Sequence, residues 1–348
     1  MVFLTICVSI SIVVIIILIC TKIEAWFNGP QTDLTHSMKG KKVVITGASR
    51  GIGLETAKDL VRQGATVIMG NRNEDSSKAA IKTILNLSHR KRLIYKHLDL
   101  TDYEDIKKFV KEIKEEYGKI DILINNAGSC FKNFTLSDGI ELTYFTNHLG
   151  HLILSFLLLE NFNEKGRIIN LVTTKYQRIS ESVLNLFTSK QNLDFSHIRK
   201  GYDWMETYVF TKLASVHLSQ FLSNCKYIEK KKIDVKVVSV HPGFINNWFF
   251  REIEKKSVYW AIRDYVVMLP SHVLLFKDNV MGAQTTLHCA YMKWEELVNG
   301  GYYRDCRYEP LKKIGLLENA KKTINFDKWI IEKNDIVKQD NDVMKIFD

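Results

Sequence analysis

The sequence lacks the cysteine pattern of a disulfide framework or of a zinc site. No two of its six cysteines form a C-x-x-C pair, which is typical of reduced thiols. The six are Cys7, Cys20, Cys130, Cys225, Cys289 and Cys306. The chain also has no internal repeat and no low-complexity tract. Its 348 residues therefore predict an ordinary globular core that needs no disulfide support.

Metal-ligand clusters and a nucleic-acid signature are lacking as well. His148 and His151 stand three residues apart, but no carboxylate or cysteine accompanies them, so we expect structural histidines and no metal site. The net charge of +10 is spread over Lys-rich clusters at 107–114, 226–232 and 312–322. Nucleic-acid binding is one interpretation of these clusters. Solvated helix faces near an anionic cytoplasmic membrane leaflet are the interpretation that we favour.

Charge is absent from Val2–Thr21, a run rich in Ile and Val. Twenty helical residues span roughly 30 Å, the thickness of the hydrocarbon core of a bilayer. The alternative is a cleaved signal peptide, but no basic residue precedes the run and only Ile23–Ala25 suggests a cleavage site. The sequence thus predicts a transmembrane anchor over residues 1–22 and a linker over 23–39. Basic residues follow the run, which places the rest of the chain in the cytosol.

Short apolar strands alternate with amphipathic helices from Gly40 onward. This alternation predicts one α/β domain over residues 40–338, built on a doubly wound parallel sheet of about seven strands. The expected strands are Lys42–Thr46, Thr66–Gly70, Arg92–Leu98, Ile120–Asn125, Gly166–Val172, Asp234–His241 and one around Gly300–Tyr303. The expected helices include Ile52–Gln63, Tyr103–Tyr117, Gly139–Leu159, Glu206–Glu229 and Glu318–Lys338. We expect segment 246–297 to cover the active site and 339–348 to be a polar tail.

A glycine-rich turn follows the first expected strand. Residues Thr46–Gly53 read TGASRGIG, in which the glycines form the pattern G-x-x-x-G-x-G. Such a turn between strand and helix lets the backbone pass close to a pyrophosphate, which the helix N-terminus then binds. A purely structural glycine turn is the alternative.

Asn125–Gly128 ends the fourth strand, at the edge where ligands bind in parallel sheets, and could approach the adenine ribose. It could also be a plain turn.

The end of the second expected strand indicates the cofactor. An acidic residue there would bind a ribose 2′-hydroxyl and repel a 2′-phosphate. This chain has Met69–Arg72 at that point, and Arg72 with Arg50 could bind a phosphate, so we predict NADP(H). Asp99, at the end of the third strand, could bond the adenine amino group or cap the helix that follows Thr101.

Together these motifs resemble the short-chain dehydrogenase/reductase family, and within it the membrane-anchored, microsomal retinol dehydrogenases. The resemblance runs from about Lys41 to Trp329 and implies a Rossmann-like fold. Its more specific parts are Asn147–His151, which reads NHLGH, and Gly282–Thr285, which reads GAQT. It implies the cofactor-binding residues Gly47, Ser49, Arg50, Gly51, Ile52, Gly53, Arg72, Asp99, Leu100, Asn126, Ala127, Gly128, Tyr208, Lys212, Pro242 and Gly243.

The family uses a catalytic tyrosine with a lysine four residues later. Four such pairs occur, at Tyr103/Lys107, Tyr208/Lys212, Tyr227/Lys231 and Tyr308/Lys312. Only Tyr208 and Lys212 fall on the helix after the fifth strand, so we expect these two to be catalytic. A nearby ammonium favours phenolate, so we expect Lys212 to lower the pKa of the Tyr208 phenol.

Two further catalytic residues are implied by the resemblance. Thr173, with Thr174 as the alternative, stands at the position of a serine hydroxyl that holds the substrate oxygen. Asn147 matches the helix-kinking asparagine that orders water in a proton relay. Two departures from the family pattern are Val172-Thr173 in place of two serines, and Asn247 in place of the Thr or Ser that bonds the nicotinamide carboxamide.

The sequence therefore predicts an NADP(H)-dependent oxidoreductase that interconverts a lipophilic aldehyde or ketone and its alcohol. Retinal and retinol are the best single guess, and a steroid or lipid-aldehyde reductase is the alternative. A cofactor-binding membrane protein with little turnover is the alternative from another class. We expect a single-pass anchor in the endoplasmic reticulum with a cytosolic catalytic domain, no nucleic-acid partner, and an organisation compatible with a homo-oligomer.

Overall fold

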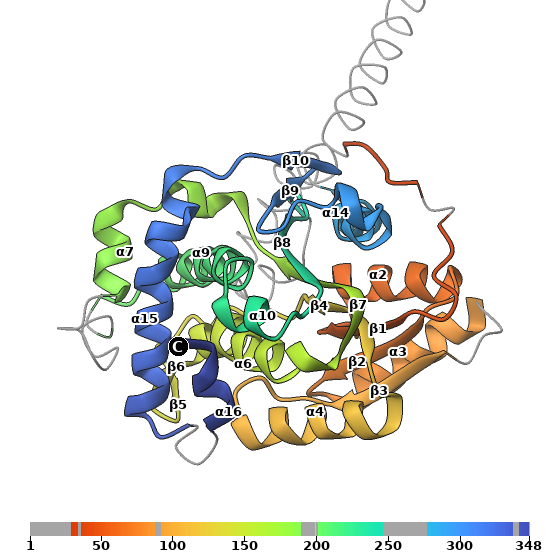
Figure 1. The fold of residues 1–348 in the computed structure, drawn as a ribbon, viewed down its shortest axis with the longest axis horizontal. Coiled ribbons are helices and arrows are strands. Elements are labelled where there is room, and N and C mark those ends of the chain that lie inside the picture. Colours follow the sequence, from red (N-terminus) through yellow and green to blue (C-terminus); the bar gives the residue numbers. More distant parts are fainter. Residues whose placement is uncertain are drawn as a thin grey trace, which may run out of the picture.

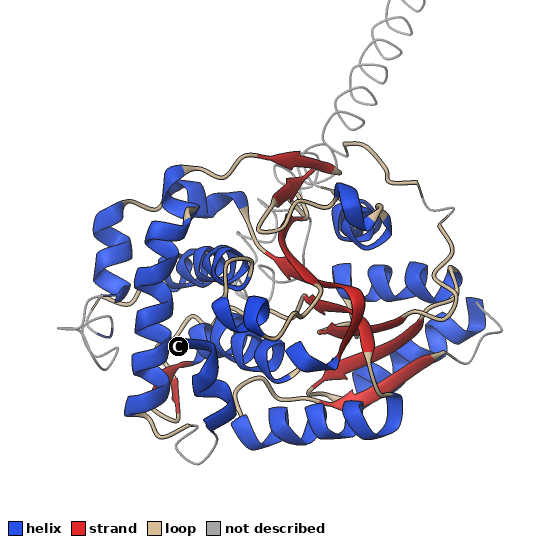
Figure 2. Ribbon diagram, in the orientation of Figure 1, coloured by secondary structure: helices blue, strands red, loops and turns tan. Residues whose placement is uncertain are grey.

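The computed structural model describes residues 29–33, 36–87, 92–188, 199, 201–245, 277–336 and 341–347. An eight-stranded sheet runs through the middle of the domain, with helices on both of its faces (Figures 1 and 2). The strand order is β10-β9-β8-β7-β4-β1-β2-β3. The strands are β1 Lys42–Thr46, β2 Thr66–Asn71, β3 Leu93–His97, β4 Ile120–Asn125, β7 Phe162–Leu171, β8 Val235–His241, β9 Tyr302–Arg304 and β10 Arg307–Glu309. All neighbouring pairs are parallel except β9 and β10.

The predicted doubly wound parallel sheet is confirmed. β1 and β4 have the predicted bounds, and the other predicted strands differ by a few residues at their ends. The edge strand β10 was not predicted. It turns back through Asp305 and Cys306, which have φ values of 49° and 55°. Their positive φ values allow the tight reversal into an antiparallel pair.

Alternating side chains of the central strands build two separate cores. Val43 and Ile45 of β1 belong to the core under α2, α3 and α14, whereas Val44 belongs to the core under α4, α6 and α9. Period-two alternation sends successive side chains to opposite faces of a sheet. Because both faces are covered, the central strands are apolar throughout, which is why the sequence shows short continuous apolar runs.

Helices connect the strands and close over both faces. Their bounds are α2 Gly51–Arg62, α3 Glu74–Leu87, α4 Tyr103–Tyr117, α5 Leu142–Tyr144, α6 Gly150–Leu157, α7 Glu181–Thr188, α9 Trp204–Leu222, α10 Lys226–Lys230, α14 Asn279–Tyr291, α15 Leu317–Lys333 and α16 Asn341–Met344. Helix α15 packs against α9 (Figure 1). Residues 339–348, predicted to be a polar tail, contain α16, and Val343 in it is buried.

The predicted helix Gly139–Leu159 is wrong at its start and in its continuity. Asp138 and Gly139 both have positive φ and form the tight turn of the hairpin between β5 Leu136–Ser137 and β6 Ile140–Glu141. The Asp-Gly dipeptide is a strong hairpin signal, so this turn could have been predicted from the sequence. The helical part begins at Leu142 and is interrupted by a π-helical turn, Phe145–Leu149, before α6. The predicted helix Glu206–Glu229 is likewise broken, into α9 and α10.

The connector before β1 packs against α14. The backbone N–H of Thr32 donates to Gln284 Oε1 at 3.0 Å, and Gln31 lies 3.5 Å from the Met281 sulfur.

The predicted anchor Val2–Thr21 lies outside the described residues, as do residues 246–276 of the predicted covering segment. Within the described part of the chain, no helix combines the length and apolar character required to span a bilayer.

Candidate active site

A cavity of about 860 Å³ opens at the carboxyl ends of the parallel strands. Residues that follow β1, β2, β3, β4, β7 and β8 line it, together with Tyr208 and Lys212 of α9. All sixteen predicted cofactor-binding residues are among the lining residues, as is Thr173. The carboxyl edge of an open parallel sheet is where ligands bind in this architecture. The structure thus brings the dispersed sequence motifs into one site.

The glycine turn leaves backbone space where side chains would otherwise lie. A Cβ on Gly53 would lie 2.4 Å from Asn126 Nδ2, and one on Gly47 would lie 2.7 Å from Ala127 Cα. Helix α2 starts at Gly51 with no side-chain cap and with no acidic residue in its first turn. Its first N–H groups therefore have no competing carboxylate and can bind an anion. This turn fits a pyrophosphate.

Asn126 joins the two loops that face this turn. Its Nδ2 donates to the carbonyl oxygens of Thr46 and Gly47 at 2.8 and 3.0 Å. The Thr46 hydroxyl accepts in return from the backbone N–H groups of Asn126 and Ala127. Asn125 instead bonds Ser155 and Asn170 inside the domain. Asn126 therefore shapes the cavity wall, while Asn125 links the sheet to α6.

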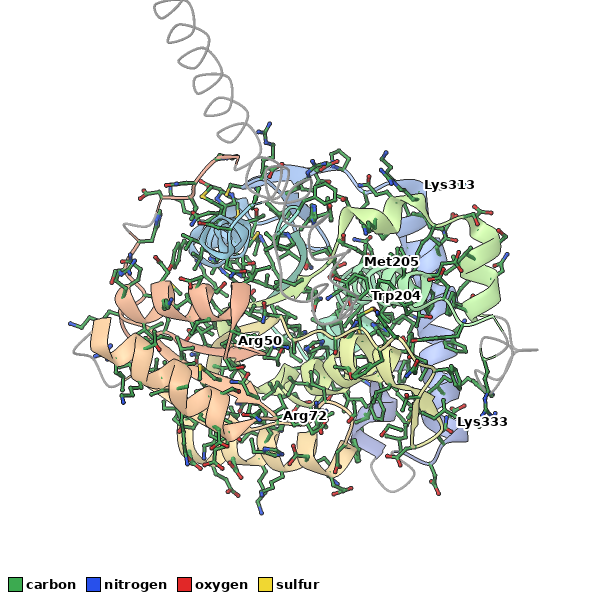
Figure 3. The ribbon with its side chains drawn as sticks, turned by 180° about the vertical axis from the view of Figure 1, so that it is seen from behind. Arg50, Arg72, Trp204, Met205, Lys313 and Lys333 are labelled. Atoms are coloured by element: carbon green, nitrogen blue, oxygen red, sulfur yellow. The ribbon has the colours of Figure 1, made fainter. Side chains whose placement is uncertain are left out.

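Two arginines lie at the phosphate end of the cavity. Arg50 and Arg72 are on the same face of the molecule (Figure 3), and the Arg72 side chain is 66% exposed. Asn71 ends β2 and is buried, with its amide bonded to Ala48 N–H and to Ser77. No carboxylate occupies the strand end itself. Arg50, Asn71 and Arg72 all line the cavity at this point.

The alternative role predicted for Asp99, capping the helix that follows Thr101, is wrong. Asp99 Oδ1 accepts from the backbone N–H and the hydroxyl of Thr101, at 2.9 and 2.7 Å. Its Oδ2 lies 3.8 Å from the Arg72 guanidinium. The cap of α4 is a different residue, Asp102, which accepts from Glu104 and Asp105 N–H. Asp99 therefore orders its own loop and sits against Arg72 while lining the cavity.

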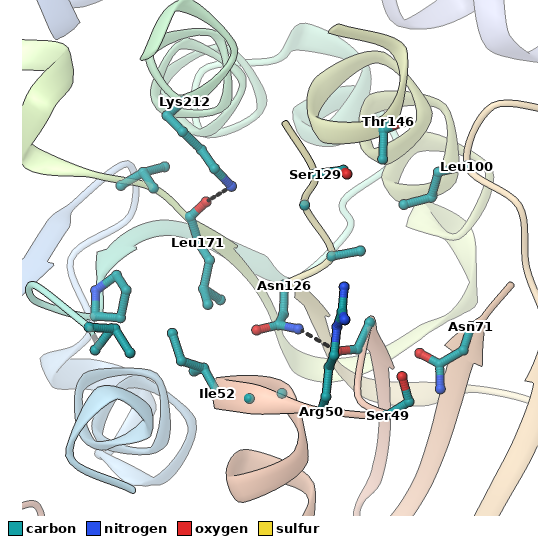
Figure 4. A pocket seen from close by; sticks show the side chains of 18 of the residues that line it. Ser49, Arg50, Ile52, Asn71, Leu100, Asn126, Ser129, Thr146, Leu171 and Lys212 are labelled. Atoms are coloured by element: carbon teal, nitrogen blue, oxygen red, sulfur yellow. Dashed lines mark hydrogen bonds between the residues drawn. The ribbon is translucent and has the colours of Figure 1, made fainter. Parts of the chain in front are cut away.

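Of the four Tyr/Lys pairs, only Tyr208 and Lys212 line the cavity. Asp203 caps the start of α9 by accepting from Met205 and Glu206 N–H, and this fixes the register that turns both side chains toward the sheet. Lys212 Nζ donates to the Leu171 carbonyl at 3.0 Å, and Figure 4 shows it across the cavity from Arg50 and Ser49. Lys107 and Lys231 also lie over the rings of their tyrosines. Placement in the fold distinguishes Tyr208 and Lys212 from the other pairs, whereas the local geometry of tyrosine and lysine does not.

Burial sets the protonation states of this pair. Burial, with a smaller contribution from Cys130, raises the pKa of Tyr208 above its ordinary value, and burial lowers the pKa of Lys212 to about 8. The direction for Tyr208 is opposite to the predicted one. Lys212 Nζ is 5.9 Å from the Tyr208 ring centroid, so desolvation of the phenol outweighs its charge. At neutral pH Tyr208 is a phenol and Lys212 is mainly an ammonium.

The structure separates the two threonines at the end of β7. Thr173 lines the cavity and caps the short helical turn that follows, with its Oγ1 3.4 Å from Lys175 N–H. Thr174 is turned toward β8, where its hydroxyl lies 3.5 Å from His241 Nε2. Thr173 is therefore the hydroxyl that faces the site.

Asn147 lies within the π-helical turn, behind the cavity wall. Its Oδ1 accepts from Ser129 N–H at 2.7 Å, and its Nδ2 donates to Ser129 O at 2.8 Å and to Thr211 Oγ1 at 3.1 Å. Its own carbonyl accepts from His151 Nδ1 at 3.0 Å. The expected kink at Asn147 is present as this turn. Asn247 lies outside the described residues.

The expectation of structural histidines agrees with the contacts of His151. Its Nε2 lies 2.9 Å from the Thr46 hydroxyl, and burial lowers its pKa to about 3, so it is neutral. Among the described residues, no cluster of His, Cys, Asp and Glu could hold a metal ion.

Some lining residues were not predicted from the sequence. Ser129, Phe131, Lys175 and Phe244 are four of them, and each follows a strand end by a few residues. The signal available was position, because residues just beyond the carboxyl ends of parallel strands face the ligand crevice. Family motifs do not include these positions.

The fold and the site together define a nucleotide-dependent oxidoreductase of the α/β class. The sequence profile of the short chain dehydrogenase family matches residues 41–191. Retinol dehydrogenase 11 of Homo sapiens is 31% identical over 277 residues, which are 78% of this chain and 79% of that protein. The chloroplastic short-chain dehydrogenase TIC 32 A of Brassica napus is 32% identical over 286 residues, 79% of this chain and 83% of that protein.

The chain therefore belongs to the short-chain dehydrogenase/reductase family, in the branch that includes the retinol dehydrogenases. Members of this family are oxidoreductases that use a nicotinamide cofactor. A short chain dehydrogenase from Burkholderia cenocepacia J2315, solved in complex with NADP, superposes with a TM-score of 0.55 at 21% identity. It covers 77% of this chain and 96% of its own, and this likeness concerns the fold.

Proposed function

We propose that this protein is an NADP(H)-dependent enzyme that interconverts a lipophilic aldehyde or ketone and the corresponding alcohol. One observation carries the proposal: Tyr208, Lys212 and Thr173 line the same cavity as the glycine turn and Asn126–Gly128. A cofactor-binding wall and an acid/base group thus face one space. The relatives named retinol dehydrogenase support retinal or retinol as the substrate.

The residues of the chain divide the chemistry between them. The bound cofactor supplies hydride to, or takes it from, the substrate carbon. Tyr208, a phenol at neutral pH, donates the proton to the carbonyl oxygen during reduction. Thr173 donates a hydrogen bond to that same oxygen. Lys212 would hold the nicotinamide ribose of the bound cofactor, and the first turn of α2 would hold its pyrophosphate.

The preference for NADP(H) is supported by the charges near β2. Arg50 and Arg72 both line the cavity, and guanidinium groups pair well with phosphates. The end of β2 itself carries Asn71, which is fully engaged in bonds to Ala48 and Ser77. A 2′-phosphate bound there would lie near the guanidinium groups of Arg50 and Arg72, and the residue that ends β2 is an amide and not a carboxylate.

A turnover screen tests the substrate class. The full chain in membranes or detergent is supplied with NADPH or NADH and with retinal, a steroid ketone or a medium-chain aldehyde. We expect NADPH oxidation fastest with retinal. Preference for the steroid or the aldehyde would replace retinal with that substrate. Cofactor binding without turnover of any of the three would favour the low-turnover alternative, whose only sequence support is Thr173 and Asn247.

We also propose that Val2–Thr21 anchors the protein in the endoplasmic reticulum membrane, with the catalytic domain in the cytosol. The uncharged run and the basic residues after it support this topology. Deleting residues 1–24 should move most of the enzyme from the membrane to the soluble fraction after cell lysis. Replacing them with an unrelated transmembrane segment should restore the membrane fraction.

Protease digestion of sealed microsomes tests the side of the membrane. Protease added outside should cleave the domain of the intact protein. Complete protection, together with glycosylation of Asn133 in its Asn-Phe-Thr sequence, would place the domain in the lumen and contradict the topology.

A further inference from the structure

One buried carboxylate holds both sides of the π-helical turn that carries Asn147. Asp327 of α15 bonds Tyr144, three residues before Asn147, and His148, the residue after it. We infer that Asp327 is a positioning residue for Asn147, although it lies 180 residues away in the sequence. The inference rests on the proposed function, because Asn147 acts in the site only if that function is correct.

The contacts lie in the interior of the domain. The Tyr144 hydroxyl donates to Asp327 Oδ1, and His148 Nε2 is 2.9 Å from Asp327 Oδ2. Asp327 and His148 have no exposed surface, and Tyr144 is 1% exposed. A buried carboxylate is stable only when donors satisfy it, and a charged acceptor strengthens such bonds. Each of the three residues therefore constrains the other two.

Tyr144 extends this clamp to the catalytic helix. Its ring stacks on Phe210 of α9 with centroids 5.8 Å apart and planes within 10°. Phe210 lies between Tyr208 and Lys212 in the sequence. The other side of Tyr144 meets Phe326, the neighbour of Asp327, edge to face at 5.9 Å. The clamp therefore sets the π-helical turn and α9 relative to each other.

Asn147 needs this support because its own bonds depend on an exact position. It bridges both backbone groups of Ser129, a cavity-lining residue, and the Thr211 hydroxyl of α9. A π-helical turn contains an extra residue and is less stable than the α-helix around it. Small misplacements of site residues reduce rates strongly, by about 100-fold for 1 Å.

The protonation state of Tyr144 agrees with its role as donor. Burial and the adjacent Asp327 carboxylate raise the pKa of Tyr144 well above its ordinary value. The hydroxyl therefore keeps its proton at neutral pH and donates a hydrogen bond to Asp327.

The test is a double-mutant cycle between Asp327→Asn and Asn147→Ala, made in the full chain and measured with NADPH and the best substrate of the screen. Each single variant should lower kcat about 10- to 100-fold, while the dissociation constant of NADPH changes less than about 3-fold. The double variant should be no more than about 3-fold slower than the slower single variant, because both changes disable one group. If the fold-losses in kcat of the two single variants multiply in the double variant, the inference is wrong.

Thr323→Val is the matched control. Thr323 is also buried on α15, but its hydroxyl bonds His217 of α9 at 2.7 Å and not Tyr144 or His148, the partners of Asp327. It should lower the melting temperature without lowering kcat. If it lowers kcat as much as Asp327→Asn does, loosening of α15 explains both variants and the inference is wrong.

A second readout does not depend on activity. Hydrogen–deuterium exchange of the peptide containing residues 145–152 should accelerate in Asp327→Asn and stay unchanged in Thr323→Val. An unchanged rate in Asp327→Asn would contradict the clamp. If the wild-type chain turns over no carbonyl, the proposed function fails while this measurement still decides whether Asp327 holds the turn. Tyr144→Phe removes one donor only and replaces Asp327→Asn if that variant does not fold.

Discussion

Tyr208→Phe should reduce turnover at least about 100-fold and leave NADPH binding nearly unchanged, because it removes the phenol that supplies the proton. The raised pKa of Tyr208 keeps its hydroxyl protonated at neutral pH, so the loss should be evident in the reductive direction. Single-turnover kinetics with NADPH, and cofactor titration by fluorescence, measure the two effects separately.

Tyr227→Phe is the control for this variant. Tyr227 also has a lysine four residues later, and its hydroxyl bonds Glu160 on the surface, far from the cavity. It should retain full activity. Retained activity in Tyr208→Phe would mean that the acid/base group lies elsewhere.

Arg72→Asp should change the ratio of kcat/KM between NADPH and NADH by at least about 30-fold in favour of NADH. The change removes a charge-assisted bond to the 2′-phosphate and introduces repulsion beside Asp99, effects that together exceed about 2 kcal/mol. Initial rates with both cofactors over a range of concentrations measure the ratio.

Arg62→Asp is the matched control for the cofactor experiment. Arg62 is similarly exposed and also lies close to a carboxylate, with 3.5 Å to Asp59, but it is at the far end of α2. Its substitution should leave the ratio unchanged. The same ratio in Arg72→Asp as in the wild type would refute the role assigned to the end of β2.

Much of this fold and site could be predicted because local patterns determined them. The apolar runs of β1 and β4 and the glycines at 47, 51 and 53 specify a strand, a turn and a helix without reference to the rest of the chain. The Tyr208/Lys212 pair could be selected among four because strand order alone places it at the carboxyl edge. The Tyr/Lys motif and the order of the strands were together sufficient to select this pair.

Features that depend on tertiary contacts were missed. The direction of the Tyr208 pKa shift depends on how deeply α9 packs, which no spacing reveals. The carboxylate partner of His148 comes from α15, so the absence of a nearby carboxylate in the sequence said nothing about the folded neighbourhood. The late start of the predicted helix Gly139–Leu159 arises from an Asp-Gly turn that helical periodicity obscured.

With the proposed anchor in a bilayer, the packing of the connector against α14 would limit how the domain can move relative to the membrane. Gly29 and Pro30 already lie against the domain, and Thr32 is hydrogen-bonded to Gln284. Only residues 22–28 therefore separate the proposed anchor from the part of the connector that packs on the domain. Seven residues extend at most roughly 25 Å. Asn279, in the first turn of α14, lines the cavity. The short connection to the proposed anchor would therefore keep the opening of the cavity close to the bilayer surface. A substrate dissolved in the lipid would then have only a short distance to travel through water to reach Tyr208.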